Sequence, residues 1–266
     1  NYDSANDTLT DSVTYRVKRL SKVGDGDLST SQNVEFDAQA GHFYLLQTGA
    51  DADHLTDMSI IESDVDGKRT ALMPQGHYKV IGIELVQRSR THYFGYSGEE
   101  KGLYTVNYDS KGLSARSTTY FHYTNDTLDQ SVTYRGEVIA DSFEKAAVVP
   151  GVIRRSVTTY FGNEGEEKAK ATYTFTFKGD RIKAVTDFEY DDTDMLVKSV
   201  TFKNNNPTDD IAEAQRSVRR SETFYRGNEG EEKAQWTFNY NFNGDQVRTA
   251  THFEYEDGEG RLLRST

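Results

Sequence analysis

A tandem repeat constrains the fold of this chain more than any other feature. Residues 154–169 read RRSVTTYFGNEGEEKA and residues 219–234 read RRSETFYRGNEGEEKA, so the two segments are identical at 13 of 16 positions. A third Gly-Glu-Glu-Lys run begins at Gly98, and the corresponding glycines, Gly165 and Gly230, follow at spacings of 67 and 65 residues. Repeats of this length form stacked or radial supersecondary units, because one unit cannot bury its hydrophobic face alone.

Each repeat divides into four runs in which polar and apolar residues alternate. In the second repeat these runs are about 154–162, 168–178, 181–190 and 195–203. The second run has apolar side chains at every other position, and the residues concerned are Ala171, Tyr173, Phe175 and Phe177 in the second repeat and Ala234, Trp236, Phe238, Tyr240 and Phe242 in the third. A period of two predicts strands with one buried and one solvated face.

Turn residues separate the predicted strands. Lys-Gly-Asp at 178–180 and Asn-Gly-Asp at 243–245 lie between the second and third runs, and such sequences are typical of tight hairpins with positive φ. Each repeat is therefore predicted to be a four-stranded antiparallel meander. We expect short connector helices between repeats, at about 140–147 and 209–217, because both segments have helix-forming composition and the second has an acidic first turn.

The fold class predicted from these patterns is all-β. Three four-stranded repeats and the remaining strand-like segments give a large antiparallel meander of about 15 strands, which closes or nearly closes into a barrel-like sheet so that its edges are hidden; the alternative is a curled sheet with protected ends. The predicted segments are a partial repeat at 1–17, an inserted β region or small subdomain at 18–87, and repeats at 88–153, 154–218 and 219–266 that form one domain.

Composition excludes several classes of partner and chemistry. A net charge of −12 argues against nucleic acid and anionic membrane surfaces, which require clustered lysine and arginine. The absence of cysteine excludes disulfides, thiol nucleophiles and thiolate metal sites. No signal peptide and no run of 18 apolar residues is present, so no transmembrane segment is predicted. Because the chain begins inside strand-like sequence, we expect a leader or lipid-anchor segment upstream of Asn1.

Two short motifs carry a resemblance to known proteins. Residues 108–113 read YDSKGL and residues 255–262 read YEDGEGRL, and both resemble the YD-type β-hairpin repeat of bacterial cell-surface proteins. The first motif lacks the usual arginine, and the second is one residue longer and has glutamate for aspartate. The whole chain also resembles uncharacterised bacterial secreted lipoproteins with a porin-like β architecture. This resemblance implies an extracytoplasmic, non-enzymatic protein and assigns no site residues.

An outer-membrane-type β-barrel is the main alternative architecture, since strands with one aromatic face would suit lipid. The same face carries charge in the middle of its strands: Glu222 and Arg226 alternate with Phe224, and Lys198 lies between apolar residues. A basic side chain at the middle of a bilayer costs roughly 2–4 kcal/mol. The charges therefore favour a sheet outside the membrane.

A calcium site is predicted at one end of the sheet, where the meander brings acidic turns together. Calcium takes six to eight oxygen ligands in flexible geometry. The candidate ligands are Glu164, Glu166, Asp191, Asp192, Asp194, Glu229 and Glu231. The alternative is that these are solvated turn residues, whose charge Lys101, Lys168 and Lys233 partly neutralise.

Other metal sites receive less support. Asp64-Val65-Asp66-Gly67 matches part of a calcium loop, but Glu62 and Met73 occupy ligand positions that need other residues, so a hairpin turn is predicted instead. The six histidines are His42, His54, His77, His92, His122 and His252. His42 and His77 both follow a glycine and precede strand-like sequence, so we expect them to lie close together. Two ligands without a third predict strand-edge packing rather than zinc.

No catalytic motif is present. The chain contains no nucleophile elbow, HExxH sequence or phosphate-binding glycine loop. Trp236 and the alternating tyrosines suit a glycan-stacking platform if their face is open, but their regular alternation favours a buried core.

The sequence therefore predicts a non-catalytic binding or structural protein from a bacterium, located outside the cytoplasm in the periplasm or on the outer cell surface. Its partner is an unidentified protein or glycan, and calcium is the only cofactor for which candidate residues exist. A transport barrel and a carbohydrate-active enzyme are the alternatives.

Overall fold

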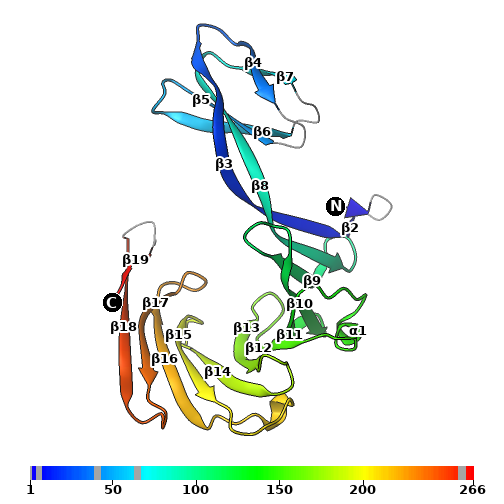
Figure 1. Cartoon of the computed structure of the whole chain (residues 1–266), viewed down its shortest axis with the longest axis vertical. Coiled ribbons are helices and arrows are strands. Elements are labelled where there is room, and N and C mark those ends of the chain that lie inside the picture. Colours follow the sequence, from blue (N-terminus) through cyan, green and yellow to red (C-terminus); the bar gives the residue numbers. More distant parts are fainter. Residues whose placement is uncertain (1, 4–7, 39–42, 63–66, 257–261) are drawn as a thin grey trace. The chain divides into compact units, whose positions relative to one another are not determined.

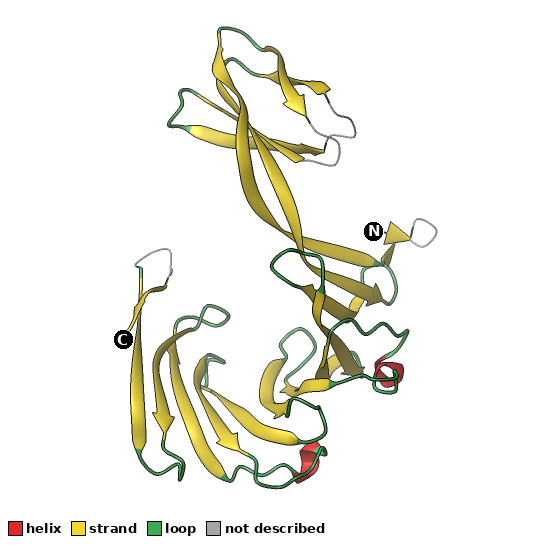
Figure 2. Cartoon of the chain, in the orientation of Figure 1, coloured by secondary structure: helices red, strands yellow, loops and turns green. Residues whose placement is uncertain are grey.

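A computed structural model describes residues 2–3, 8–38, 43–62, 67–256 and 262–266 (Figure 1). The fold is all-β, as predicted, and consists mainly of a large antiparallel meander (Figure 2). The chain forms two compact units. Unit 1 comprises Asn1–Asp11, Thr91–Asn107 and Ala115–Thr266, and unit 2 comprises Ser12–Arg90 and Tyr108–Ser114.

The meander of unit 1 runs from β8 to β19 in chain order, and each strand pairs with the next. Its strands are β8 (Gly76–Phe94), β9 (Lys101–Tyr108), β10 (Ala115–Thr124), β11 (Thr127–Arg135), β12 (Arg154–Phe161), β13 (Lys168–Phe175), β14 (Ile182–Tyr190), β15 (Leu196–Lys203), β16 (Val218–Arg226), β17 (Lys233–Tyr240), β18 (Val247–Tyr255) and β19 (Leu262–Ser265). A two-stranded hairpin of β1 (Tyr2–Asp3) and β2 (Thr8–Leu9) precedes them. The predicted runs of the second repeat therefore correspond to β12, β13, β14 and β15.

Unit 2 has its own core. Its strands are β3 (Asp11–Leu28), β4 (Gln32–Ala38), β5 (Phe43–Gly49), β6 (Leu55–Glu62), β7 (Gly67–Met73) and the first part of β8. β5 pairs with both β6 and β8, β3 pairs with the other edge of β8, and β4 pairs with β7. Phe36, Tyr44, Met73 and Val80 are buried at the centre of the main apolar cluster. The predicted inserted region 18–87 lies within this unit.

One face of the meander is buried in the first two repeats. Val157, Tyr173, Phe175 and Val185 are buried on neighbouring strands of the second repeat, as the alternation predicts. The prediction is wrong for Phe177 and its counterpart Phe242. Both are exposed, because β13 and β17 end two residues earlier and the chain has already entered the turn.

The opposite face carries pairs of threonines. Hydroxyl groups of directly opposed threonines lie 2.8 to 2.9 Å apart across neighbouring strands, and the pairs are Thr91–Thr105, Thr119–Thr133, Thr158–Thr172, Thr186–Thr201 and Thr223–Thr237. Cross-strand hydroxyl pairs of this kind stabilise a sheet whose face meets water. This face is the predicted wet side.

The segments between repeats contain less helix than predicted. Within 140–147 the helix α1 covers only Phe143–Ala146, with Ser142 as its N-cap, and within 209–217 only a single 3-10 turn, Ile211–Glu213, is present. In the second segment Ala214 is already extended, with ψ at 131°. Each segment therefore contains only one short helical turn.

The strand order of the main sheet has two ends, β19 and β6. Among the residues that the structure describes, no closed barrel is found. Closure or near-closure into a barrel therefore stays a prediction.

Candidate functional site

An exposed row of rings lies on the apolar face of the third repeat. Phe224, Trp236 and His252 are direct neighbours across β16, β17 and β18, and Phe238 lies two residues along from Trp236 on the same face. We call these four residues the aromatic strip. Trp236 is 41% exposed and Phe224 is 39% exposed. The predicted burial of Trp236 in a core is therefore wrong.

The rings of the aromatic strip are packed against one another. The Trp236 ring lies 4.4 Å from the His252 ring, at an interplanar angle of 26°, and 6.0 Å from the nearly parallel Phe238 ring. Phe224 meets Phe238 edge-on at 6.0 Å. The indole is thus already stacked with the imidazole of His252.

Polar groups border the aromatic strip on one side. The Tyr240 hydroxyl donates a hydrogen bond of 2.6 Å to Glu222, and Arg219 lies 3.2 Å from the same carboxylate. Glu222 is next to Phe238 across β16 and β17. The Glu222 carboxylate predicted on this face is therefore paired.

The corresponding face of the first repeat is covered by the segment 136–153, which follows its last strand. The hydroxyl of Tyr120, at the position of His252, is hydrogen-bonded to the carbonyl groups of Val138 and Ala140 and accepts from the Ala140 N–H at 2.6 Å. Tyr120 is fully buried, and burial raises its pKa to about 12. This cover is held to the sheet by hydrogen bonds to its own backbone, at Val138 and Ala140.

The second repeat is covered in the same way by residues 204–217. Arg216 makes a two-pronged ion pair with Asp187, which occupies the position of His252 in that repeat. The hydrogen bond to Asp187 raises the pKa of Arg216. The Ile182 N–H donates to the Thr208 carbonyl at 2.8 Å. In both earlier repeats, then, the chain covers its own apolar face with a connecting segment.

The Gly-Glu-Glu-Lys runs form a second kind of site, at the junctions between repeats. The second glutamate of each run accepts a hydrogen bond from the backbone N–H of a leucine that is the first or second residue of a strand before that repeat. The bonds join Glu100 to Leu9 at 2.9 Å, Glu167 to Leu128 at 2.9 Å and Glu232 to Leu196 at 3.0 Å. We call each of these bonds a junction clasp. The Leu196 N–H holds the pKa of Glu232 below its ordinary value, and the Leu9 N–H does the same for Glu100.

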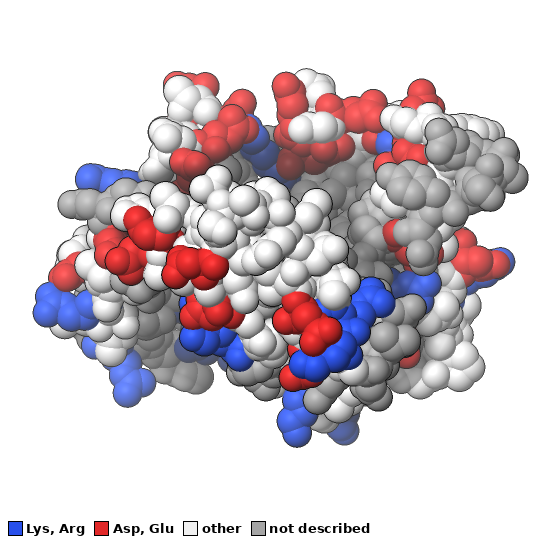
Figure 3. Space-filling view, turned by 90° about the horizontal axis from the view of Figure 1, so that it is seen from above, with Lys and Arg blue, Asp and Glu red and all other residues white. Residues whose placement is uncertain are grey.

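Lysines of the same runs bridge two acidic turns. Lys101 lies 2.9 Å from Asp126 and 3.0 Å from Glu164, and Lys168 lies 2.8 Å from Asp194 and 3.3 Å from Glu229. The hydrogen bond to Asp194 raises the pKa of Lys168. Figure 3 shows groups of acidic side chains on the surface, several of them next to lysine or arginine.

The predicted calcium ligands are therefore distributed over several interactions. The Lys168 ammonium group lies between the carboxylates of Asp194 and Glu229, and the Lys101 ammonium group lies beside Glu164. Asp191 accepts from the N–H groups of Thr193 and Met195 within its own turn. The remaining candidates, Asp192, Glu166 and Glu231, are exposed. Across the described part of the chain, no group of three or more histidine, aspartate or glutamate side chains has an arrangement that could hold a metal ion. Calcium binding stays a prediction.

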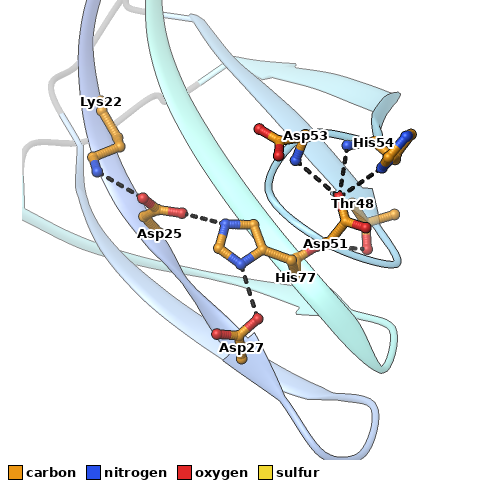
Figure 4. A network of polar contacts seen from close by, with 8 residues as sticks. All are labelled: Lys22, Asp25, Asp27, Thr48, Asp51, Asp53, His54 and His77. Carbon is orange, nitrogen blue, oxygen red and sulfur yellow. Dashed lines mark hydrogen bonds and ion pairs between the residues drawn. The ribbon is translucent and has the colours of Figure 1, made fainter.

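Unit 2 contains a polar network around His77 (Figure 4). The His77 ring lies between two carboxylates of β3, with Nε2 at 2.7 Å from Asp25 and Nδ1 at 2.9 Å from Asp27. The side chain of His77 is only 13% exposed, and Lys22 is 2.6 Å from Asp25. The hydrogen bond to Asp27 raises the pKa of His77, so the imidazolium form is stabilised. Sequence reasoning missed this network, because Asp27 and Asp25 lie 50 and 52 residues before His77 in the chain.

The other predicted histidine positions have separate environments. His42 and the segment 64–66 of the calcium-like loop lie outside the described residues. Four histidines have an acidic neighbour through Nδ1, and these pairs are His54 with Asp51 at 2.7 Å, His92 with Asp11 at 3.3 Å, His122 with Asp129 at 2.7 Å and His252 with Glu254 at 3.7 Å.

No protein-family model matches this chain, and no curated protein matches it. None of the helices in the described residues is long and apolar enough to cross a membrane.

Proposed function

We propose that this chain is a non-catalytic, extracytoplasmic bacterial protein that binds a polypeptide segment on the aromatic strip. The observation that carries the proposal is the exposure of Trp236, on a face that the two earlier repeats cover. Neither closure into a barrel nor calcium is required for this function, because the strip is a surface of the sheet itself. The extracytoplasmic location rests on the resemblance to secreted bacterial proteins.

Two features favour a polypeptide over a glycan as the ligand. The covers of the first two repeats are stretches of backbone, so this face of the fold already accommodates peptide groups and small apolar side chains such as Val138. The stacking of His252 on Trp236 reduces the flat aromatic area that a pyranose ring needs. Aromatic side chains also dominate the energetics of peptide and protein interfaces.

The experiment uses Trp236, the single tryptophan of the chain, as a fluorescent reporter. Synthetic peptides with the sequences of residues 136–153 and 204–217 are titrated into the protein, and cellohexaose and chitohexaose form the glycan arm. We expect a saturable blue shift of the emission with at least one peptide, because a covered indole loses contact with water.

The matched variants are Phe224→Ala with Phe238→Ala, which remove the strip but keep the reporter, and Phe177→Ala, which removes an exposed ring outside the strip. The double variant is expected to weaken peptide binding at least tenfold, and the control variant is expected to leave it unchanged. A response to the glycans alone would replace the polypeptide ligand with a carbohydrate. No response to either class would overturn the proposed function.

A further inference from the structure

A cavity of about 510 Å³ is lined mainly by residues of β11 and β12 and of the segments that cover the first and second repeats. Its apolar lining includes Val132, Tyr134 and Val157 from the sheet and Phe143 and Ile211 from the covers. The three sheet residues are buried. Small-molecule sites have volumes of roughly 300–1,000 Å³ and combine an apolar lining with a few polar groups. The polar groups of this cavity therefore indicate what it binds.

Tyr134 brings a polar group to this cavity. Tyr134 is 3% exposed, and within the described part of the chain its hydroxyl group takes part in no hydrogen bond. The fully buried Tyr120 instead bonds to backbone groups of the cover. Burial raises the pKa of Tyr134, so its hydroxyl group keeps the proton at neutral pH. Because an unpaired buried polar group is unfavourable, Tyr134 can supply a hydrogen-bond donor to a ligand of this cavity.

The hydroxyl group of Tyr134 is not needed for packing at this position of the fold. The sequence Ser-Val-Thr-Tyr that ends at Tyr134 corresponds to the sequence Ser-Val-Thr-Phe that ends at Phe202 in the next repeat. The two strands also agree in structure, since Ser131 and Ser199 each lie within hydrogen-bond distance of a tyrosine hydroxyl group on the next strand. A ring without the hydroxyl group therefore suits the fold, and the hydroxyl group of Tyr134 is available to a ligand.

An arginine–aspartate pair borders the same cavity. Arg154 lies directly opposite Tyr134 across β11 and β12, and its guanidinium group lies 3.3 Å from the Asp209 carboxylate. Hydrogen bonds between such charged groups are normally about 2.7–2.9 Å long, so this pair is loose and can take a further partner. Asp210 also lines the cavity and accepts from the Ala212 N–H at 2.9 Å. Among the described residues, no lysine or arginine pairs with Asp210.

We infer that this cavity binds a free apolar α-amino acid as its zwitterion. The ligand carboxylate accepts from the Arg154 guanidinium group and the Tyr134 hydroxyl group, the ligand ammonium group lies beside Asp209 and Asp210, and the apolar side chain packs on Val157. A carboxylate and an ammonium group joined through one carbon match an arginine–aspartate pair of the opposite orientation, so both charges are compensated. This inference goes beyond the aromatic strip and does not depend on it.

The charge of the cavity argues against a simple carboxylic acid as the ligand. Asp209 and Asp210 supply two carboxylates for the single guanidinium group of Arg154. A ligand with a carboxylate alone would add a further negative charge, whereas a zwitterion adds none. The apolar lining in turn favours leucine, isoleucine, valine or phenylalanine over polar amino acids.

Isothermal titration calorimetry of the 266-residue chain with these four amino acids tests the inference. We expect saturable binding of at least one of them, with one molecule per chain. Its amide, which lacks the carboxylate, and its N-acetyl form, which lacks the ammonium group, are each expected to bind about tenfold more weakly, the loss for one hydrogen bond to a charged group. No binding of any of the four would overturn the inference, and so would equal affinity for the amide or the N-acetyl form.

Two variants test the residues assigned to the ligand. Tyr134→Phe is expected to weaken amino-acid binding about tenfold, because the carboxylate loses a hydrogen bond. Its melting temperature without ligand should stay the same or rise, since Phe202 fills the corresponding position. Asp209→Asn is expected to reduce the preference for the amino acid over its N-acetyl form. Unchanged affinity of Tyr134→Phe together with an unchanged preference of Asp209→Asn would refute the site.

The matched control is Tyr160→Phe, which removes a hydroxyl group that lies 3.0 Å from the Ser131 hydroxyl group and does not line the cavity. This variant should bind the amino acid like the unmodified chain. The comparison of the amino acid with its two derivatives needs no variant, so it decides the inference even if a variant does not fold. A shift of Trp236 emission on addition of the amino acid would locate binding at the aromatic strip and overturn the assignment to this cavity, while the proposed function would stand.

Discussion

The second glutamate of each Gly-Glu-Glu-Lys run forms the junction clasp, and the first glutamate of the run does not. Glu232 reaches the backbone of the preceding repeat, whereas Glu231 is exposed. From the sequence the two are indistinguishable, since both belong to one acidic turn. The position of the N–H donor, 36 residues away in the chain, decides between them.

The change Glu232→Gln tests the junction clasp. At pH 7 we expect the free energy of unfolding to fall by about 1 kcal/mol, the typical contribution of one such hydrogen bond. Because the folded state lowers the pKa of Glu232, this contribution is present above the ordinary glutamate value and is lost as the pH falls through the folded pKa. Urea unfolding at pH 7 and at pH 3 measures it. Glu231→Gln is the control, and an equal effect of the two changes would contradict the clasp.

The His77 network gives unit 2 the opposite pH dependence. The folded state raises the pKa of His77, so its contribution is fully present below the ordinary histidine value of about 6.5 and is lost as the pH rises through the folded pKa. We expect the amides of β3 and β8 near His77 to exchange faster, after correction for intrinsic rates, at pH 8.5 than at pH 5.5. Hydrogen exchange measures this, and Asp27→Asn should reduce the difference. A protection that is independent of pH would show that the imidazole remains charged or contributes nothing.

At the scale of elements, the turn between the first two strands of each repeat depends on two glycines with different constraints. Gly162 has φ at +123°, and an added Cβ would lie 2.5 Å from the Glu166 carbonyl oxygen. Gly165 has φ at +81°, but an added Cβ would meet open space. Backbone strain acts at both positions, and a steric clash acts at the first only.

We therefore expect Gly162→Ala to destabilise the protein by more than about 2 kcal/mol and Gly165→Ala by about 1 kcal/mol. Thermal unfolding of the two variants, followed by circular dichroism, measures the difference. The reverse order would mean that the turn relaxes around the added methyl group.

The sequence predicts the strands well and the covering segments poorly. Alternation with turn residues locates β12 to β15 to within a few residues, because the period of two and the glycine turns act locally. The segments 140–147 and 209–217 have helix-forming composition, yet they contain one short turn each. Contacts with the sheet, such as that of Arg216 with Asp187, determine their conformation. Such long-range contacts cannot be predicted from the local sequence.

The exposure of the aromatic strip is also invisible in the sequence. The same alternation produces buried Ala171 in the second repeat and exposed Trp236 at the corresponding position of the third. The difference arises from what lies over the sheet, and the pattern of one strand cannot contain it. The predicted calcium ligands show the same limit, because the lysines between them come from other turns.

At the scale of the whole molecule, the covers and clasps predict a gradient of stability along the meander. β12 to β14 have neighbours on both edges and a covered apolar face, whereas β18 has a partly paired edge and an open face (Figure 1). We expect hydrogen exchange of the monomeric protein to be slowest in β12 to β14 and fastest in β18 and β19. Peptide-level mass spectrometry resolves these segments. Equal protection in β13 and β18 would argue that the third repeat gains its stability from another source.

The junction clasps have a consequence for how this chain can change its length. Every junction uses a glutamate and a lysine from equivalent turns, so joining Ile153 directly to Arg219 would place Glu232 at the Leu128 N–H in the role of Glu167, and Glu229 beside Lys101 in the role of Glu164. After an in-frame excision of one repeat, the new junction thus still has a junction clasp and a lysine contact. Duplication of one repeat by the same recombination would add one more junction of the same kind. Single genetic steps can therefore produce sheets with fewer or more strands, and the residues at the junctions between repeats need not change.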